Sequence, residues 1–592
     1  MSAKSDNQSI PRESQSSVAW MVMFGVIIVL LMTKVLWGYW DRDLTYGDTA
    51  GYFCSAVFWH ASKKVNIVWS PLYTAYYGSW LAVSENAAVA TLLHRLGLII
   101  MSTVLVAWLG CRTLPRLFAL FLACWWIALP IHYDTLFEVH LFGAIPVIVL
   151  ALVAVIAGNK WRLPLLLGVA LITTILIRNE FVLAVGIFLA LGVVRLLRGW
   201  RGLSAGDLRS ATLRHVVVLL AVGATIGLFY SASFIKGRVI KALLDDRHTL
   251  NMCQVYAVGY QQRHPDWSKD PWTECSSLMQ EKFGLPRPSL EQMLMANPRE
   301  VVEHFWWNLS LTRAGLEVLL FNATSSKTNP DYSPVRVVPV LPSVLLGLSV
   351  LTIAIGTILV YRNKPAEYIG VRGDVANLGP VLLAVLVMSL AVILTQRPRP
   401  SYLLGAGILC VWLLLAYVAA VTDKYRAVHS RLAFVGIALI LLCILPSYKS
   451  LASPVRNPTL KLIYNTLIPN QTTLCRESGK IALGEYASEI SNYLCSPHWS
   501  HLGLGPGPQV VPIATLGADA FAQPNNFAAS LDAEGVTAVV IDPFLIPKHP
   551  GLQSCSALRD GLIKQGWEQL SYSLQDDGRC IAAYVKDNEK SP

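Results

Sequence analysis

The sequence has few charged residues and lacks several compact motifs that identify soluble enzymes. Asp, Glu, Lys and Arg make up 14% of the 592 residues, whereas a soluble globular protein carries about 25%. No CxxC pair or cysteine–histidine cluster suggests zinc, and no glycine-rich loop suggests a nucleotide. No repeat of about 20–50 residues suggests a solenoid. Much of the surface must therefore face a solvent other than water.

Long apolar runs indicate that this other solvent is lipid, because 54% of the residues are hydrophobic. A run of about 20 apolar residues crosses the hydrocarbon core of a bilayer as a helix. The first run begins near Val18 and is followed by no small-residue cleavage site, so we expect a retained span and not a signal peptide. Eleven spans are predicted, which places the two termini on opposite sides: 18–39, 89–110, 115–130, 140–157, 163–177, 181–197, 215–235, 337–360, 376–395, 402–422 and 432–446.

The basic residues of the short loops predict the orientation. With a cytoplasmic N-terminus, the inside loops and their flanks hold 15 Lys and Arg against four Asp and Glu. The opposite loop 131–139 has no Lys or Arg. Because cytoplasmic loops are enriched in these residues, the net charge of +11 is explained by topology, and no nucleic-acid partner is indicated. The inside loops are 111–115, 158–162, 196–214, 361–375 and 423–431.

This topology predicts a polytopic α-helical membrane protein of the inner (plasma) membrane with a soluble periplasmic α/β domain. Residues 1–17 form a cytoplasmic tail, 18–446 a transmembrane domain, and 447–592 the periplasmic domain. Within the membrane domain, 41–88 and 236–336 are large outer loops. In the tail, 535–546 is expected to be a buried strand, 556–567 a helix closed by Gly566, and 568–585 two strands joined by an Asp-Gly turn.

The segment 296–321, at the end of the second outer loop, is expected to be an amphipathic helix on the membrane surface. Its residues Phe305, Trp306 and Trp307 are predicted at the depth of the lipid headgroups.

Seven of the eleven cysteines fall in outer segments. Six of them group by proximity into Cys253/Cys275, Cys475/Cys495 and Cys555/Cys580, which leaves Cys54 without a neighbour. An oxidising compartment permits three disulfides there, although spacing does not determine connectivity.

Four polar clusters stand at the outer ends of spans, where a charge near the bilayer needs a reason. In the first, Asp48 and Tyr52 would share a helix face, so Asp48 is either a general base or a helix N-cap. In the second, 131–143, Asp134 and Glu138 share a face and His140 follows, although a polar loop with one capping acid explains the cluster equally well.

The other two clusters carry arginines. Arg178 follows a span directly, and it is either paired with an acid such as Glu180 or binds an anion. Arg397 and Arg399, in "RPRP", make the most basic of the short outer loops. They suit a phosphate at headgroup level, unless they only meet lipid headgroups in a tight turn.

At these residues the chain resembles membrane glycosyltransferases of the C fold (GT-C), which include protein O-mannosyltransferases, aminoarabinose transferases and arabinosyltransferases. "YGDTAGYF" followed by "SPLY" at 70–73 resembles their first lumenal loop. "LLLGVALITTILIRNEFVL" resembles a span end that maps onto Arg178 and Glu180. "RPRPSYLLGA" resembles a late loop that maps onto Arg399 and Tyr402. The chain departs from these patterns because "RNE" has no proline and "RPRPSYLL" has no histidine.

The resemblance implies an inverting glycosyltransferase that moves a sugar from a polyprenyl-phosphate donor to a hydroxyl on a cell-envelope glycan, lipid or protein. Asp48 would deprotonate the acceptor, and Arg178 or the pair Arg397/Arg399 would hold the departing phosphate. Some relatives use a divalent cation, Mg²⁺ or Mn²⁺, near the first-loop acid. The remaining candidate substrate-binding residues are Tyr52, Asp134, Glu138, His140, Glu180 and Tyr402.

Other functions remain open. An O-antigen-ligase-like transferase would lack a substantial soluble tail. A transporter or flippase of envelope glycolipid would show inverted repeats and charges at mid-membrane, and a scaffold needs far fewer spans.

Overall fold

The structure is a computed structural model, and it describes most of the membrane domain and much of the C-terminal domain. The described residues are 70–84, 87–129, 138–199, 205–232, 247–328, 330, 336–362, 369–422, 480–483 and most of 509–586, with single positions between 25 and 60.

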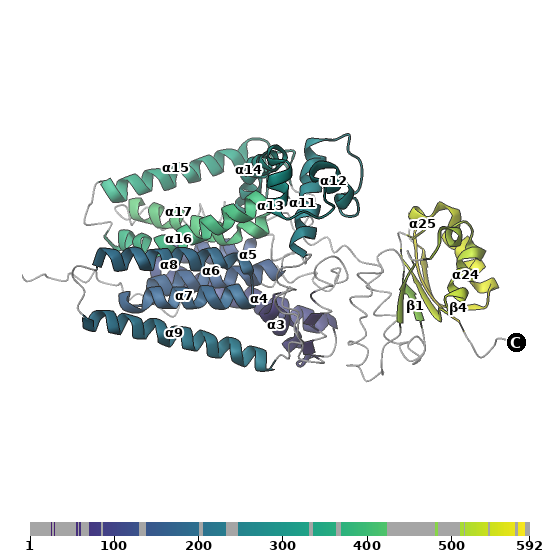
Figure 1. Cartoon of the computed structure of the whole chain (residues 1–592), viewed down its shortest axis with the longest axis horizontal. Coiled ribbons are helices and arrows are strands. Elements are labelled where there is room, and N and C mark those ends of the chain that lie inside the picture. The colour runs from purple at the N-terminus through teal and green to yellow at the C-terminus, as the bar shows by residue number, and fades with distance from the viewer. Residues whose placement is uncertain are drawn as a thin grey trace, which may run out of the picture.

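Long apolar helices form a bundle (Figure 1). Within the described residues, eight are long and apolar enough to cross a membrane, and each coincides with a predicted span. A ninth predicted span, 115–130, is the shorter helix α5 (Arg116–Ala128). Spans 18–39 and 432–446 lie wholly or mostly outside the described residues. The eight are α4 (Ala87–Thr113), α6 (Glu138–Ile156), α7 (Asn159–Leu176), α8 (Val182–Gly199), α9 (Ala205–Ala232), α15 (Leu341–Arg362), α16 (Ile369–Thr395) and α17 (Pro400–Thr422).

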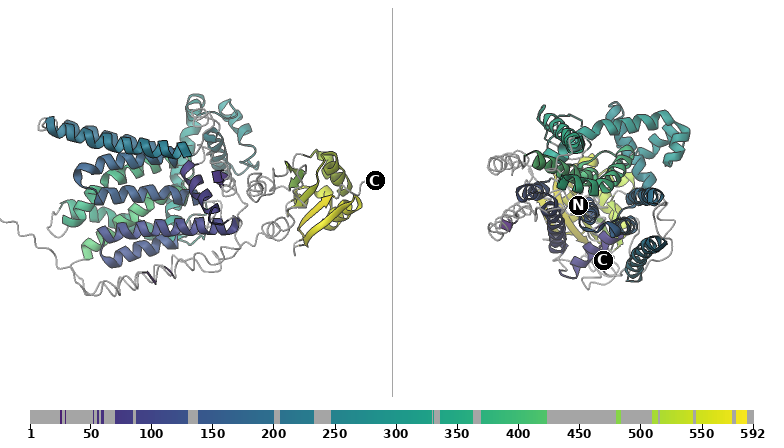
Figure 2. Two further views of the ribbon diagram at one scale, coloured as in Figure 1. Left: turned by 90° about the horizontal axis from the view of Figure 1, so that it is seen from below. Right: turned by 90° about the vertical axis from the view of Figure 1, so that its left-hand side faces the viewer.

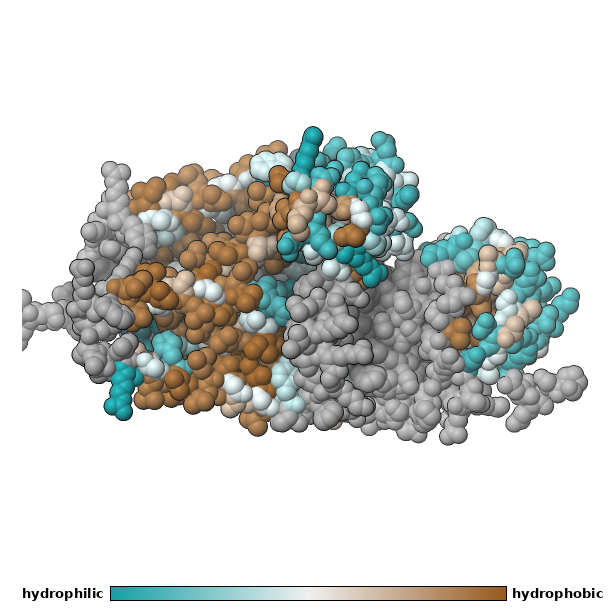
Figure 3. All heavy atoms as spheres, in the orientation of Figure 1, coloured by the Kyte–Doolittle hydropathy of each residue, from teal (hydrophilic) through white to brown (hydrophobic). Residues whose placement is uncertain are grey.

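The helices differ in how deeply they are buried. In the most apolar stretches of α17 and α6, 72% and 67% of the residues lie inside the molecule, against 11% for α9 and α15. Figure 2 shows α9 along the outside of the bundle. Apolar side chains cover the outer surface of the helices (Figure 3). Because such a surface is stable only in lipid, the chain is a multi-pass membrane protein.

Helix α3 (Pro71–Leu81) belongs to the first outer loop. The "SPLY" segment begins it, with Ser70 in a left-handed conformation and Pro71 at the first helical position. The hydroxyl of Ser70 donates a hydrogen bond to the carbonyl of Ile177. The first outer loop is thereby fixed to the end of α7.

In its described residues the second outer loop contains four helices: α11 (Arg247–Arg263), α12 (Cys275–Phe283), α13 (Leu290–Ala296) and α14 (Pro298–Phe321). Helix α13 starts with a capping box between Ser289 and Gln292. Asn297 then caps α14 through the backbone amide of Glu300. We call these four helices the outer module.

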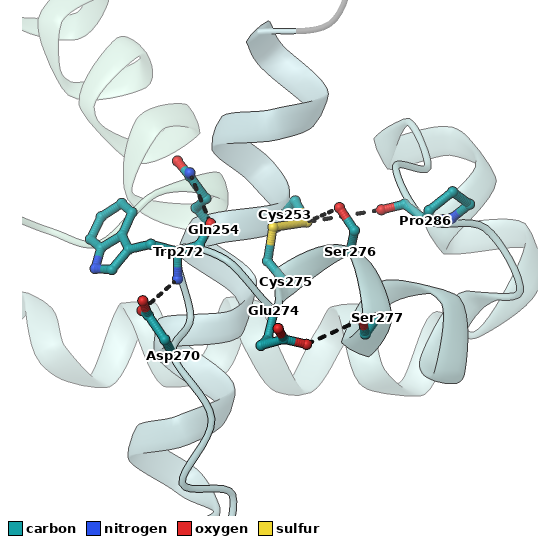
Figure 4. Close-up of a disulfide and its surroundings, with 9 residues drawn as sticks. All are labelled: Cys253, Gln254, Asp270, Trp272, Glu274, Cys275, Ser276, Ser277 and Pro286. Atoms are coloured by element: carbon teal, nitrogen blue, oxygen red, sulfur yellow. Dashed lines mark hydrogen bonds between the residues drawn. A yellow bond between two sulfur atoms is a disulfide. The ribbon is translucent and has the colours of Figure 1, made fainter. Parts of the chain in front are cut away.

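A disulfide between Cys253 and Cys275 joins α11 to α12 inside the apolar core of the outer module (Figure 4). One predicted pair is thus confirmed. The expectation for the aromatic run of α14 is only partly correct, because Phe305 packs against this core and the indole of Trp307 donates to Gln262 at 3.0 Å. Trp306 alone is well exposed. Consecutive helical residues point about 100° apart, so three in a row do not share a face.

The C-terminal domain is a five-stranded sheet of order β2-β1-β3-β5-β4. Strands β1 (Lys480–Leu483), β2 (Gln509–Pro512) and β3 (Ala538–Ile541) are parallel, whereas β5 (Cys580–Lys586) runs antiparallel to β3 and β4 (Trp567–Leu574). The strand predicted at 535–546 is the shorter β3, because a short helix, α25 (Leu545–Lys548), begins at Leu545. The two predicted C-terminal strands and the predicted helix, α26 (Cys555–Lys564), are confirmed. So is the disulfide Cys555–Cys580. The predicted pair Cys475/Cys495 lies outside the described residues.

Helix α3, the outer module and the sheet domain lie toward the same end of the bundle (Figure 1). These three parts come from the segments predicted to share the outer side. We refer to this end as the outer end.

Candidate functional site

A pocket opens at the outer end of the bundle, where α6, α16 and α17 meet the turn between α7 and α8. Its polar lining residues are His140, Arg178, Glu180, Ser389, Ser401 and Tyr402. Four of these six were predicted as site residues, and they come from three segments that lie far apart in the sequence. The structure therefore brings three of the four predicted clusters to one place.

The pocket is mostly apolar below its polar mouth. Val147 of α6, Val385 and Met388 of α16, and Leu404 of α17 line it, together with the polar Ser389. Val385 is ten residues from the outer end of α16 at Thr395, a distance of about 15 Å at 1.5 Å per residue. The pocket thus combines a charged entrance with an interior that suits a hydrocarbon chain.

Arg178 is the fixed cation of the pocket. Its backbone amide bonds to the carbonyl of Thr173 at 2.8 Å, and its Nε forms an ion pair with Glu180, which follows in a short 3-10 turn, η4 (Asn179–Phe181). The guanidinium lies over the ring of Tyr402, 5.8 Å from its centroid. Burial opposes the charge, but Glu180, with Tyr402 and Tyr52, outweighs it and raises the pKa of Arg178. Arg178 therefore stays protonated.

Gly143 makes room for this arginine. A Cβ at this position of α6 would lie 2.8 Å from Cδ of Arg178, closer than real Cβ contacts. The side chain of Arg178 can cross α6 only because residue 143 has none. One turn earlier on the same helix, the ring of His140 lies 4.7 Å from the ring of Tyr402.

Arg397 and Arg399 lie in the turn between α16 and α17, and they differ in position. Arg399 is close enough to His140 to interact with it electrostatically, as is Arg178. Arg397 is buried, with 3% of its surface exposed, and is not among the residues that line the pocket. Whether either binds an anion stays a prediction.

Helix α14 of the outer module supports this turn. The side-chain amide of Asn308 donates to the carbonyl of Leu394, at 3.2 Å, near the end of α16. Gly315 lies so close that a Cβ there would be 2.1 Å from the carbonyl oxygen of Pro398. We call these two contacts the α14 brace.

Aromatic residues connect the first outer loop to the pocket. Tyr52 packs edge-on against Tyr73 at 5.1 Å and interacts electrostatically with Arg178. Tyr73 in turn lies 5.3 Å from Phe142, the neighbour of Gly143. The ring of His94 is stacked on the ring of Tyr77, with the centroids 3.9 Å apart. These rings form a packed support beside the mouth, because Tyr73, Tyr77, His94 and Phe142 are buried, and Tyr52 is the partly exposed member.

Some predicted site residues lie outside the described residues. These are Asp48, Asp134 and the side chain of Glu138, although Glu138 begins α6. Within the described part of the chain, no group of three metal-ligating residues occurs, so a cation beside Asp48 stays an expectation.

Gly143, Ser389 and Ser401 were not predicted. All are small residues in or at the start of apolar helices, and their role depends on which helix packs opposite. Nothing in the local sequence distinguishes them from ordinary packing positions.

No family model matches the chain, and no curated protein matches it significantly. Solved structures are similar to it at low identity. The archaeal oligosaccharyltransferase AglB from Archaeoglobus fulgidus, in complex with an inhibitory peptide and a dolichol-phosphate, is 13% identical with a TM-score of 0.43, covering 98% of this chain and 75% of its own. ArnT from Cupriavidus metallidurans, bound to undecaprenyl phosphate, is 10% identical with a TM-score of 0.37, covering 97% of this chain and 100% of its own.

A second structure of the Archaeoglobus fulgidus oligosaccharyltransferase, in complex with zinc and sulfate, has a TM-score of 0.42 and an identity of 13%, covering 96% of this chain and 74% of its own. All these TM-scores are below 0.5, so the similarity defines neither a family nor an activity for this chain.

Proposed function

We propose that the chain is a membrane glycosyltransferase of the GT-C kind, which transfers a sugar from a polyprenyl-phosphate donor to an acceptor hydroxyl at the outer face of the membrane. The observation that carries the proposal is the pocket itself. A fixed arginine, a histidine and a tyrosine surround its mouth, and apolar side chains from three helices line its interior.

The charge of the mouth suits a phosphate. Arg178 engages Glu180 through Nε, and it is one of the residues that line the pocket. A guanidinium binds phosphate oxygens through two parallel N–H groups. Arg399, near His140, would add a second positive charge and make the site more cationic.

The interior suits the lipid part of the donor. An isoprenoid chain that descends from a phosphate at the mouth would pass Met388 and Val385 of α16 and Val147 of α6. The anomeric carbon would then lie on the outer side of the phosphate, toward Tyr52, which is partly exposed. The sugar class is left open by these contacts.

The reaction requires one base and one leaving-group site. The acceptor oxygen attacks the anomeric carbon, its proton passes to the carboxylate of Asp48, and the bond between that carbon and the phosphate oxygen breaks. The electron pair moves onto the lipid phosphate, where Arg178 stabilises the negative charge. Attack from the face opposite the phosphate would invert the anomeric configuration. Asp48 precedes Tyr52 by four residues, which supports a place beside Arg178.

The test of this function uses cells that lack the chain. We expect mass spectrometry of their envelope glycans to show the loss of one sugar, restored by the wild-type chain and by Arg112→Ala. Arg112 is exposed on α4 and belongs to a predicted inside loop.

In the same cells, Asp48→Asn should lower transfer by about 10²–10⁴-fold while the amount of folded protein in the membrane stays the same. Full restoration of sugar transfer by Asp48→Asn rules out Asp48 as the general base. An unchanged glycan profile after deletion, with altered glycolipid distribution between leaflets, would favour a flippase instead.

A further inference from the structure

One face of α14 carries an exposed apolar stripe. Val302, Trp306 and Leu309 are 62%, 71% and 40% exposed, and their spacing of four and three residues places them on one helix face. Arg299 and Arg313 extend the same face by one turn at either end, and both are exposed. We call Val302, Trp306 and Leu309 the α14 stripe.

The stripe joins a surface that already faces lipid. At its C-terminal end, Arg313 forms an ion pair with the buried Glu317 at 3.3 Å. The hydroxyl of Ser343, in the first turn of α15, donates to the same carboxylate at 2.7 Å. Leu341 and Val344 beside it are half exposed, in a predicted membrane helix of which little is buried. The apolar surface therefore continues from α15 onto α14.

The other face of α14 is fully used within the chain. It holds the brace contacts of Asn308 with Leu394 and of Gly315 with Pro398. The stripe therefore has no packing role in the described part of the protein, and an apolar patch that remains exposed marks an interaction surface.

We propose that the α14 stripe inserts into the headgroup region of the adjacent leaflet, so that the outer module rests on the membrane. Tryptophan concentrates at the membrane–water interface, and arginines at both ends of the stripe would meet lipid phosphates. The occupant of the stripe is thus the bilayer surface, independent of any sugar transfer.

Photo-crosslinking in lipid nanodiscs tests the proposal. A benzophenone amino acid replaces Trp306 in the full-length chain, in nanodiscs of phosphatidylethanolamine and phosphatidylglycerol. The matched control replaces Glu281 of α12, which is 65% exposed on a helix that lies farther from the bundle than α14 (Figure 1). We expect lipid adducts at 306, at least about fivefold above those at 281, because the headgroup region is only a few ångströms deep.

The role of the arginines at the ends of the stripe is tested in the same preparation. Nanodiscs of phosphatidylcholine alone, or the variant Arg299→Gln, should lower the lipid adducts at 306 about twofold or more, since an interfacial arginine is attracted to an anionic surface. Equal lipid adducts at 306 and 281 overturn the proposal. So does crosslinking of 306 to a second copy or to another segment of the chain, or the absence of any adduct from a monodisperse sample.

Discussion

Two turns at the outer end of the bundle carry arginines that the sequence marks as anion ligands, and the structure uses them differently. After α7, Arg178 lies at the mouth of the pocket, held by Glu180 and Tyr402. After α16, Arg397 is buried within a turn that α14 braces. The position of a cation at a span end therefore does not determine its role. The role is determined by the helix that packs against the turn. Gly143 of α6 leaves space for Arg178 in the pocket, whereas α14 covers the turn that contains Arg397.

The largest expected difference between the two turns is in donor binding and transfer. Arg178→Ala should lower the rate of sugar transfer by about 10²–10³-fold, because a charge-stabilising contact to the leaving phosphate is lost. Arg397→Ala should reduce the amount of folded protein before it affects the pocket. Undecaprenyl phosphate binding to the purified proteins, measured by native mass spectrometry beside the yield of folded protein, checks both. If both variants fold in normal amounts and lose binding equally, the two arginines do not differ in role.

A methyl group at residue 143 tests the first turn without removing its charge. Gly143→Ala should displace Arg178 and reduce undecaprenyl phosphate binding by on the order of 10–10²-fold, as misplacement by about 1 Å typically does. The matched variant is Gly186→Ala on α8, where a Cβ meets nothing within 4 Å. Binding by Gly143→Ala that matches the binding by Gly186→Ala would show that Arg178 does not need this space.

The same change in the second turn should affect stability. Gly315→Ala places a methyl group against the carbonyl of Pro398, and overpacking of this kind costs about 1–3 kcal/mol. We expect a lower melting temperature in detergent, with Gly347→Ala on α15 as the control because a Cβ there is unobstructed. A melting temperature equal to that of the control would indicate that α14 can shift away from the turn without loss of stability.

The smallest effect concerns pH. Burial, and then the charge of Arg263, lower the pKa of His304 on α14 from 6.5 to about 3. The unfolded state binds more protons between these values, so the free energy of unfolding of the outer module should fall as pH drops below about 6.5. Hydrogen exchange of α14 measures this fall. The variant His304→Gln should flatten the pH dependence, and an unchanged slope would exclude this histidine as its source.

Much of the fold could be predicted because lipid imposes simple constraints. Nine predicted spans coincide with helices, since apolar length alone decides whether a segment can cross. The pairs Cys253–Cys275 and Cys555–Cys580 were predictable because the partners are near in sequence. The buried C-terminal strand was predictable from its continuous apolar run, and the hairpin from the Asp-Gly pair between two strand-like segments.

The site was only partly predictable. His140, Arg178 and Glu180 were identified because ionisable residues at span ends are costly, and Tyr402 was identified through the resemblance of its loop. The burial of Arg397, the small residue opposite Arg178 and the partial burial of Phe305 and Trp307 depend on packing between distant segments. No local pattern in the sequence encodes these contacts.

The carboxylate of Glu317 has a mechanical consequence. It accepts hydrogen bonds from the hydroxyls of Thr324, Ser325 and Ser343 and from the amide of Ser325, and its side chain is fully buried. Of these donors, Ser343 belongs to α15, so this carboxylate connects the end of α14 to the start of α15. We therefore expect a tilt of the outer module to move the first turn of α15 with it.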